Sequence, residues 1–536
     1  MTLATQKIGM WGLGIVGWSV LKYLAVQKIN PPANLAKIKF SDFSLTVFEQ
    51  RELSPAELAL LSDLGVSQEV NLENFLNSMD LIIPSPGVDL RAYQVYKPKF
   101  YSELDLFAAS FNKPILAITG SLGKTTITTV LAELLTKLNL RVDVGGNIGV
   151  GMCDLIAQQA DLDLVVLELS SFQLEQAQSF YAQGALWTNF CANHLDRHDN
   201  LVDYFNAKLN LFELQESTGI SLLPNELLDN PGLLNLANLK SKLSWFGLTR
   251  PEEKLLKLID SGKIKQIYYL RDNFIVREQA GGFSNLIAIS ELDPSILLIN
   301  WVALVGFLDL VNNNLRASEI LPGVTLDQKL AKNTNVIRDQ VWGPAGNIIN
   351  ILREYKFAGI EHRVELFAEI NGVKFYNDSK STVPEATLAA LERLTNPSAN
   401  LKNITVTGAA HVNTNTYTSN SDSVTISFSP IILILGGLGK GVQRDKFIGE
   451  LADFHRKSKN LKQILIFGGE SQDLKKWCDS ANLNSLICAD LSDVVAQVWQ
   501  IAKPGDRVLF SPSGSSYDLF KNYMVRGQEF KKLVLK

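Results

Sequence analysis

A glycine-rich segment with a lysine, residues 118–126, is the part of the chain best suited to chemistry. It reads Ile-Thr-Gly-Ser-Leu-Gly-Lys-Thr-Thr and lies between an apolar run and a helical pattern. Backbone N–H groups of such a loop, together with the following helix N-terminus, can surround phosphate oxygens. Lys124 would then reach the terminal phosphates, and the Thr125 hydroxyl would bind Mg²⁺. The usual pattern has a glycine where this chain has Ile118. We therefore predict a shortened phosphate loop; the alternative is a glycine turn with an exposed lysine.

A second glycine pattern, Gly-Leu-Gly-Ile-Val-Gly at residues 12–17, follows the first apolar run. A dinucleotide fingerprint occupies this position in α/β folds, and Glu49 after the next run could bind a ribose, although the usual spacing is about 20 residues. The alternative is a turn that only packs a strand against a helix. Two nucleotide sites, of which one has the lysine loop, suggest ATP together with a nucleotide-bearing substrate.

Three further side chains in the middle of the chain could hold a metal or a phosphate. Glu168 ends an apolar run, and a carboxylate there is costly unless it is paired or bound to a metal. His194 is one of only five histidines, and its spacing leaves a ligand role and a structural role equally open. The helical pattern around Lys208 by itself predicts a solvated lysine.

Polar turns recur in the last third of the chain, where each follows an apolar run. Arginine and lysine in such turns could offset the charge of a transferring phosphoryl group, and glycine and serine turns could bind a carboxylate. The turns are His362-Arg363, Asn377–Thr382, Gly436–Lys440 and Ser511–Ser516.

The elements that must position these side chains are predicted from apolar runs without alternation, which suit parallel strands buried on both faces. A helix is expected at Ile127–Leu138, and a strand–turn–strand at EHRVELFAEINGVKFY around an Asn-Gly turn. The loop Val412–Ser427 is expected to be exposed. The strand-like runs are Ile8–Trp11, Leu81–Ile83, Ile115–Ile118, Leu164–Leu167, Ile431–Leu435 and Val508–Phe510.

Composition and charge exclude several classes of protein. The 536 residues are 46% apolar and 20% charged with a net charge of −4, which predicts a globular protein without a nucleic-acid or anionic-membrane surface. The four cysteines form no CxxC pair, which argues against zinc and disulfide frameworks and favours a reducing compartment. The amino terminus lacks the order of a signal peptide. The apolar stretch Ile296–Leu308 is too short to span a membrane and predicts a buried helix.

Taken together, the motifs resemble those of the Mur ligases of peptidoglycan synthesis, in the family's order and over the whole chain. The likeness is greatest to members that add D-glutamate to UDP-N-acetylmuramoyl-L-alanine, because the signature Asp-Asn-Pro-Arg of the diaminopimelate- or lysine-adding members is absent. The motifs are GLGIVG, SPGV, TGSLGKTT, GGNIG, LELSSFQLE, NHLDRH, AKL, EHR, NDSKST, GGLGKG and SPSGSSYDLFKNYMVRGQEF.

The resemblance implies an α/β fold of three domains. An amino-terminal Rossmann-like domain, residues 1–110, would hold the UDP group. A central P-loop α/β ATPase-like domain, residues 111–357 with an insertion at about 312–358, would hold ATP and Mg²⁺. A carboxyl-terminal Rossmann-like domain, residues 358–536, would hold the amino acid. We expect a cytoplasmic monomer that uses UDP-N-acetylmuramoyl-L-alanine and D-glutamate, with no nucleic-acid partner and no membrane span.

The resemblance also implies roles for individual residues, by position in the motifs. The catalytic residues would be Lys124, His194, Lys208 and Lys380. ATP would contact Gly120, Ser121, Leu122, Gly123, Lys124, Thr125, Thr126, Asn300, Arg363 and Asp378. The UDP-bearing substrate would contact Gly14, Ile15, Val16, Glu49, Gln50, Ser85, Pro86, Gly87 and Asn147. The amino acid would contact Thr382, Lys440, Ser516, Tyr517 and Tyr523. Mg²⁺ would bind Thr125, Glu168, His194 and Lys208, the last as a carbamylated lysine.

Several positions depart from the family's pattern. Leu122 replaces an asparagine in the phosphate loop, Asn193 stands where an acid is common, and Tyr517 and Tyr523 replace leucine and phenylalanine. These changes leave open a sibling ligase that adds L-glutamate or another amino acid. A P-loop NTPase switch without ligase activity is a second alternative, and a dehydrogenase built on residues 12–17 would leave the Lys124 loop unexplained.

Overall fold

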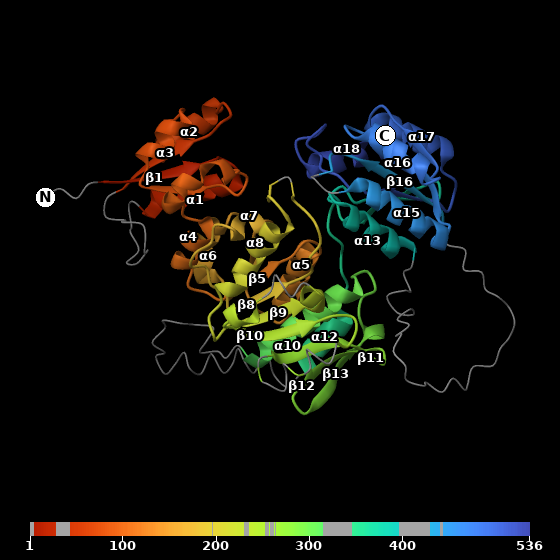
Figure 1. Cartoon of the computed structure of the whole chain (residues 1–536), viewed down its shortest axis with the longest axis horizontal. Helices are drawn as coiled ribbons and strands as arrows, with labels where there is room; N and C mark the ends of the chain where they lie inside the picture. The colour runs from red at the N-terminus through yellow and green to blue at the C-terminus, as the bar shows by residue number, and fades with distance from the viewer. Residues whose placement is uncertain are drawn as a thin grey trace. The chain divides into compact units, whose positions relative to one another are not determined.

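A computed structural model describes residues 5–27, 43–195, 197–229, 235–251, 257, 262, 264–314, 346–395, 429–439 and 443–536. The chain divides into two compact units (Figure 1). Unit 1 consists of Met1–Phe190, Arg197–Leu292 and Ile299–Tyr355, and unit 2 consists of Cys191–Asp196, Asp293–Leu298 and Lys356–Lys536. The expected domain boundaries at 110 and 357 stay predictions, and the expected loop Val412–Ser427 lies outside the described residues.

Unit 1 begins with a parallel sheet of four strands in the order β3-β2-β1-β4. After β1, the chain adds β2 and β3 on one side of β1 and then β4 on its other side. The carboxyl end of β1 is therefore a topological switch point, where ligands bind in sheets of this kind. The elements are β1 (Gln6–Trp11), α1 (Ile15–Gln27), β2 (Phe43–Phe48), α2 (Pro55–Asp63), β3 (Val66–Glu69), α3 (Leu72–Ser78) and β4 (Leu81–Pro84).

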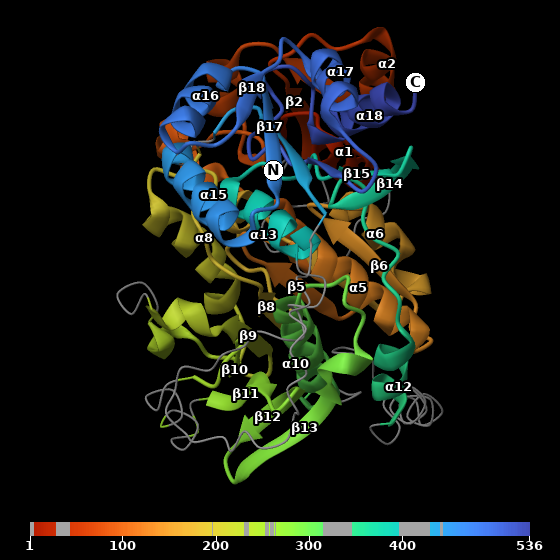
Figure 2. The same ribbon diagram turned by 90° about the vertical axis from the view of Figure 1, so that its right-hand side faces the viewer.

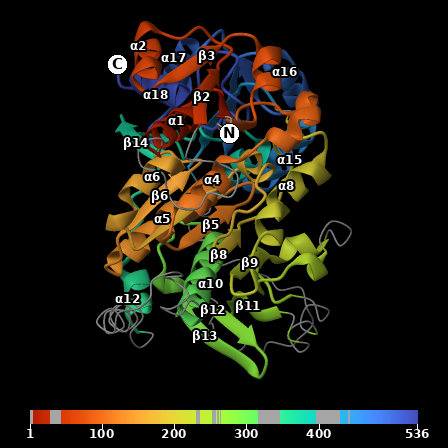
Figure 3. The ribbon, with the colours of Figure 1, turned by 90° about the vertical axis from the view of Figure 1, so that its left-hand side faces the viewer.

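The second sheet of unit 1 has nine strands in the order β13-β12-β11-β10-β9-β8-β5-β7-β6. The strands from β6 to β11 pair in parallel, whereas β12 and β13 are antiparallel (Figure 3). The strands are β5 (Ile115–Thr119), β6 (Val142–Gly146), β7 (Leu164–Glu168), β8 (Gly184–Trp187), β9 (Ile220–Pro224), β10 (Lys242–Phe246), β11 (Ile264–Arg271), β12 (Phe274–Gln279) and β13 (Gly282–Ala288). The helices are α4 (Glu103–Ser110), α5 (Lys124–Lys137), α6 (Met152–Gln158), α7 (Ser171–Leu174), α8 (Leu201–Glu213), α10 (Leu298–Asn314) and α12 (Gly346–Glu354).

One hydrophobic core joins the two sheets of unit 1. Ile8 of β1 and Ala117 of β5 belong to the same cluster of buried residues, together with residues of α1, α4 and α6. The Ser19 hydroxyl of α1 accepts from the backbone N–H of Asp154 in α6 at 3.1 Å. Continuous burial of this kind explains why both sheets fall within one compact unit.

Helix α10 confirms the prediction of a buried helix, with later bounds than the expected Ile296–Leu308. Val302, Leu304 and Phe307 are fully buried, and the Tyr268 hydroxyl of β11 donates to Asp309 at 2.8 Å. Among the described residues, we find no helix with the length and apolar character required to cross a membrane.

Unit 2 contains a six-stranded sheet in the order β14-β15-β19-β16-β17-β18, in which only the edge strand β14 is antiparallel. One face packs against α13, α15 and α16, and the other packs against α17 and α18 (Figure 2). The elements are β14 (Glu365–Ile370), β15 (Val373–Asn377), α13 (Pro384–Thr395), β16 (Ile431–Gly436), α15 (Arg444–Ser458), β17 (Leu461–Phe467), α16 (Ser471–Ser480), β18 (Ser485–Ile487), α17 (Leu491–Ile501), β19 (Arg507–Phe510) and α18 (Tyr523–Val534).

All six apolar runs that predicted strands are strands, with ends that differ by one or two residues, and the predicted hairpin is β14–β15. The predicted helix after the phosphate loop is α5, which begins at Lys124 rather than at residue 127.

Candidate functional site

The predicted phosphate loop connects β5 to the N-terminus of α5. Gly120 and Gly123 have φ angles of 139° and 77°, which L-residues with a side chain rarely adopt. Gly123 is the N-cap of α5 and offers no capping side chain. The first N–H groups of α5 lack partners within the helix, so this end of the helix is suited to bind an anion.

Residues that follow β8 fix the shape of this loop. Asn189 accepts from the N–H of Leu122 at 2.8 Å through its side chain and from the N–H of Ser121 at 3.0 Å through its backbone. The Thr188 hydroxyl donates to the carbonyl of Leu122 at 2.6 Å. The sequence interpretation missed both residues; the signal was a polar Thr-Asn pair within an otherwise apolar segment.

Two lysines converge on the carbonyl oxygen of Gly120. Lys124 Nζ donates to it at 2.8 Å and to the carbonyl of Ser121 at 3.0 Å, and Lys208 Nζ donates to it at 2.9 Å. Lys208 is buried, and its ammonium lies 4.5 Å from the centre of the Tyr204 ring. The helical pattern that alone predicted a solvated Lys208 is therefore wrong, because the face of α8 that carries it packs on the phosphate loop.

Glu168 lies beside the loop, at the carboxyl end of β7. Its backbone pairs with Ile118 of β5 and with Gly146 of β6. The carboxylate is fully buried and accepts from the side-chain amide of Asn147 at 2.7 Å. The structure thus brings Asn147, which was expected to contact the UDP-bearing substrate, to the expected metal ligand Glu168.

Thr125 and Asn300 also meet the loop. Thr125 is buried in the first turn of α5. A Cβ atom placed on Gly123 would lie 3.1 Å from Oδ1 of Asn300, although the two residues are far apart in the sequence. The donor set of this region, a hydroxyl, a buried carboxylate and loop N–H groups, suits a triphosphate with Mg²⁺.

The residues predicted for the UDP-bearing substrate gather at the carboxyl end of β1. Glu49, Gln50 and Gly87 line a surface cleft of about 820 Å³, together with Arg91 and Tyr93, which were not predicted. Leu13 N–H donates to the Glu49 carboxylate at 2.6 Å, and the Ser85 hydroxyl donates to the carbonyl of Gly12 at 2.9 Å. Gly14 directly precedes α1, and Ile15 and Val16 begin the helix, with the Ile15 side chain exposed. Pro86 adjoins Ser85 in the turn after β4.

Unit 2 brings Asp378 into a buried polar cluster at the carboxyl ends of β15 and β19. The Ser511 hydroxyl donates to its carboxylate at 2.7 Å, and the Val364 N–H donates at 3.1 Å. Burial raises the pKa of Asp378 to about 7, although these hydrogen bonds and the charge of Arg363 act in the opposite direction. The predicted ATP residues Asp378 and Arg363 are therefore electrostatic neighbours within unit 2.

Among the residues predicted for the amino acid, Tyr523 lies next to the Asp-Ser-Lys turn. Lys380 Nζ is 5.4 Å from the centre of the Tyr523 ring, and the Ser379 hydroxyl donates to the Tyr523 carbonyl at 2.8 Å. Ser516 is buried and Tyr517 is largely exposed. Thr382 follows this turn before α13, and Lys440 lies outside the described residues. These roles stay predictions.

Two buried arginines, which the sequence interpretation missed, hold the turns of unit 2. Arg526 donates to the carbonyl of Ser379 at 2.8 Å and to that of Gly514 at 3.0 Å. Arg444 donates to the carbonyls of Gly436 and Pro512, both at 3.1 Å. The signal in the sequence was their position. Arg444 follows the glycine turn Gly436–Lys440, and Arg526 lies within the motif Ser511–Phe530.

His194 belongs to unit 2, in a backbone conformation with φ of 56°, and its role as a metal ligand stays a prediction. Elsewhere in the described part of unit 2, Glu361, His362 and Glu365 could also hold a metal. Lys531 Nζ already lies 3.1 Å from Glu361 and 2.6 Å from Glu365, so we assign no metal there.

Comparisons with known proteins show which proteins this chain is similar to. The family described as "Mur ligase middle domain" matches residues 118–263. The chain is 30% identical to the UDP-N-acetylmuramoylalanine–D-glutamate ligase of Thermoanaerobacter sp. (strain X514), over 100% of this chain and 99% of that protein. It is 28% identical to the ligase of the same name from Aliivibrio fischeri (strain ATCC 700601 / ES114), over 98% and 97%. The crystal structure of MurF ligase from Thermotoga maritima in complex with ADP covers 92% of this chain and 94% of that chain, with a TM-score of 0.50 and 14% identity, which shows likeness of fold.

Proposed function

Because the chain belongs to the Mur ligase family, we propose that it adds D-glutamate to UDP-N-acetylmuramoyl-L-alanine in an ATP-dependent reaction of peptidoglycan synthesis. The observation that carries this proposal is the likeness, over the whole length of both chains, to ligases named for that reaction. The phosphate loop with its two lysines supports the use of ATP.

The reaction would proceed in two steps of amide bond formation. The alanine carboxylate of the UDP-bearing substrate attacks the γ-phosphorus of ATP, so that an acyl phosphate forms and ADP leaves. The amine of glutamate then attacks the acyl carbon, and the tetrahedral intermediate collapses to the amide and inorganic phosphate. We name no general base for the amine proton.

The chain's own residues would bind and orient these groups. The N–H groups at the start of α5 and the Lys124 ammonium would hold the phosphates and offset charge as the phosphoryl group transfers. Mg²⁺, when bound, would neutralise part of the phosphate charge, and Thr125, Glu168, His194 and carbamylated Lys208 are the proposed ligands. Lys380 would add positive charge, and glutamate would be held by Thr382, Lys440, Ser516, Tyr517 and Tyr523.

Location and assembly are also part of the proposal. We propose a cytoplasmic location, since the four cysteines at 153, 191, 478 and 488 form no CxxC pair, as is usual in a reducing compartment. We also propose that the protein acts as a monomer.

The test is phosphate release with ATP, Mg²⁺, UDP-N-acetylmuramoyl-L-alanine and each of a panel of D- and L-amino acids. We expect release that depends on D-glutamate. Release that ignores the amino acid would instead identify an NTPase without ligase activity, and dependence on another amino acid would identify a sibling ligase.

A further inference from the structure

Arg197, which the expected reaction leaves without a role, binds the turn that follows β4. Its two terminal nitrogens donate to the carbonyl oxygens of Gly87 and Val88, each at 2.9 Å. Gly87, Val88 and Asp89 line the cleft at the carboxyl end of β1. A residue far along the chain therefore fixes the wall of the cleft in which we place the UDP group.

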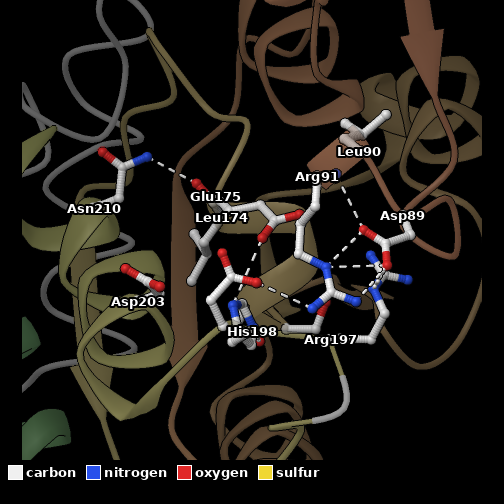
Figure 4. Close-up of polar contacts among 12 residues, drawn as sticks. Asp89, Leu90, Arg91, Leu174, Glu175, Arg197, His198, Asp203 and Asn210 are labelled. Carbon is white, nitrogen blue, oxygen red and sulfur yellow. Dashed lines mark hydrogen bonds and ion pairs between the residues drawn. The ribbon is translucent and has the colours of Figure 1, made fainter. Parts of the chain in front are cut away.

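The guanidinium of Arg197 is itself held in position. It lies 4.7 Å from the centre of the Phe172 ring, and its Nε is 4.0 Å from the Asp89 carboxylate. Asp89 is in turn bound by Arg91, whose hydrogen bonds lower the pKa of Asp89 to about 2, so Asp89 stays ionised. Figure 4 shows Asp89 between the two arginines.

The ring of Phe172 also packs against a buried histidine, His198. The His198 and Phe172 rings stack with centroids 5.4 Å apart and an interplanar angle of 17°. His198 Nε2 is 2.9 Å from the Ser171 hydroxyl, and its Nδ1 is 3.8 Å from the Glu175 carboxylate (Figure 4). Arg197 thus packs on Phe172 of α7, which is itself held by the His198 ring.

This arrangement controls which polar groups the turn presents to a ligand. A peptide group is planar, and its C=O and N–H point in opposite directions. Because the carbonyls of Gly87 and Val88 face Arg197, the amide N–H groups of Val88 and Asp89 are directed away from it. Val88 N–H donates to the carbonyl of Ser85 at 2.9 Å, which closes the turn. The carbonyl dipoles of Gly87 and Val88, which would repel an anion, therefore point to the Arg197 guanidinium.

We propose that Arg197 is a positioning residue for the UDP-bearing substrate, because it binds the carbonyls of Gly87 and Val88 and so keeps these two dipoles from facing the anionic diphosphate. The inference rests on the proposed function for the identity of that ligand. It assigns no contact between Arg197 and the substrate, and it predicts an effect on the UDP-bearing substrate alone.

The test compares Arg197→Met and Arg197→Lys with the wild-type full-length chain. Methionine keeps packing against Phe172 but donates no hydrogen bond, and lysine keeps the charge without the planar fork that reaches two carbonyls. We expect Arg197→Met to raise the KM for UDP-N-acetylmuramoyl-L-alanine and the Kd for UDP about tenfold, which corresponds to about 1.4 kcal/mol. The kcat and the KM for ATP should stay within about twofold, and Arg197→Lys should have an intermediate KM.

Arg250→Met is the matched control, since Arg250 makes a bidentate pair with Glu278 on the surface. Arg250→Met should leave the kcat, both KM values and the Kd for UDP unchanged. The proposal would be overturned if Arg197→Met raised the KM for UDP-N-acetylmuramoyl-L-alanine and the KM for ATP equally, or if it left the Kd for UDP unchanged. If Arg197→Met does not fold, the KM of Arg197→Lys for UDP-N-acetylmuramoyl-L-alanine decides. A wild-type chain that binds UDP but does not use D-glutamate would refute the proposed function and leave the UDP comparison valid.

Discussion

Replacement of Gly120 by alanine should separate the geometry of the phosphate loop from its lysine chemistry. A Cβ atom at this position would lie 2.0 Å from the Thr188 hydroxyl and 3.0 Å and 3.1 Å from the backbone nitrogens of Thr188 and Asn189. The hydroxyl can rotate away, but the hydrogen bond from Thr188 to Leu122 is then lost. The two backbone nitrogens belong to the residues that directly follow β8 and have no such freedom.

The expected magnitude follows from two contributions. A residue with a side chain at a φ of 139° costs about 1–3 kcal/mol, and the lost hydrogen bond costs about 1 kcal/mol. The sum is about 2–4 kcal/mol. If the loop keeps its shape, the free energy of unfolding falls by this amount. If the loop instead moves to relieve the strain, the Kd for nucleotide rises. The same 2–4 kcal/mol, converted fully into lost affinity, corresponds to a rise of about 30- to 700-fold.

The assay measures both quantities on the same protein. Urea unfolding followed by tryptophan fluorescence gives the stability, and calorimetric titration with a non-hydrolysable ATP analogue gives the Kd. Gly449→Ala is the control, because a Cβ there meets no atom within 4 Å and φ is ordinary within α15; it should stabilise by about 0.5–1 kcal/mol. If Gly120→Ala changes neither stability nor nucleotide affinity, the loop geometry argued above is wrong.

Three further predictions concern ionisable groups. Lys124→Ala should abolish phosphate release while circular dichroism shows an unchanged fold, because its ammonium donates to carbonyls of the loop itself, those of Gly120 and Ser121; near-normal turnover would remove the phosphate-loop assignment. Burial raises the pKa of Asp378 to about 7, whereas an unfolded aspartate has about 4, so the native state binds more protons between these values and loses stability as pH rises through them. The melting temperature should therefore fall more from pH 5 to about 8 in the wild type than in Asp378→Asn, and parallel curves would contradict this. Burial likewise raises the pKa of Glu103 to about 8, so Glu103→Gln should gain stability relative to the wild type as pH rises from about 5 to 9; a constant difference would refute the buried-carboxyl account.

Local sequence predicted the strands, and the glycine loop between β5 and α5, well because their signals are local. Continuous apolar runs specify buried parallel strands, and a strand–glycine turn–helix order specifies an anion-binding helix N-terminus. The same reasoning failed for Lys208, whose helical pattern alone predicted exposure, since the burial of a helix face depends on which element packs against it.

Residues that shape the sites without a motif of their own could not be found in this way. Asn189 and Arg197 follow β8, yet their partners lie in the loop after β5 and the turn after β4. Arg526 joins two turns of unit 2 that are far apart along the chain. No spacing rule links such residues, because their proximity follows from the order of strands in a sheet.

By itself, the sequence determined the class of fold, the glycine loop between β5 and α5, and the family, since backbone conformation and motif spacing are encoded over short stretches. The tertiary structure alone decided that two lysines share the Gly120 carbonyl and that Arg197 binds the carbonyls of Gly87 and Val88. Those arrangements depend on side chains and loops from separate parts of the chain, and only the folded chain brings them within hydrogen-bond distance.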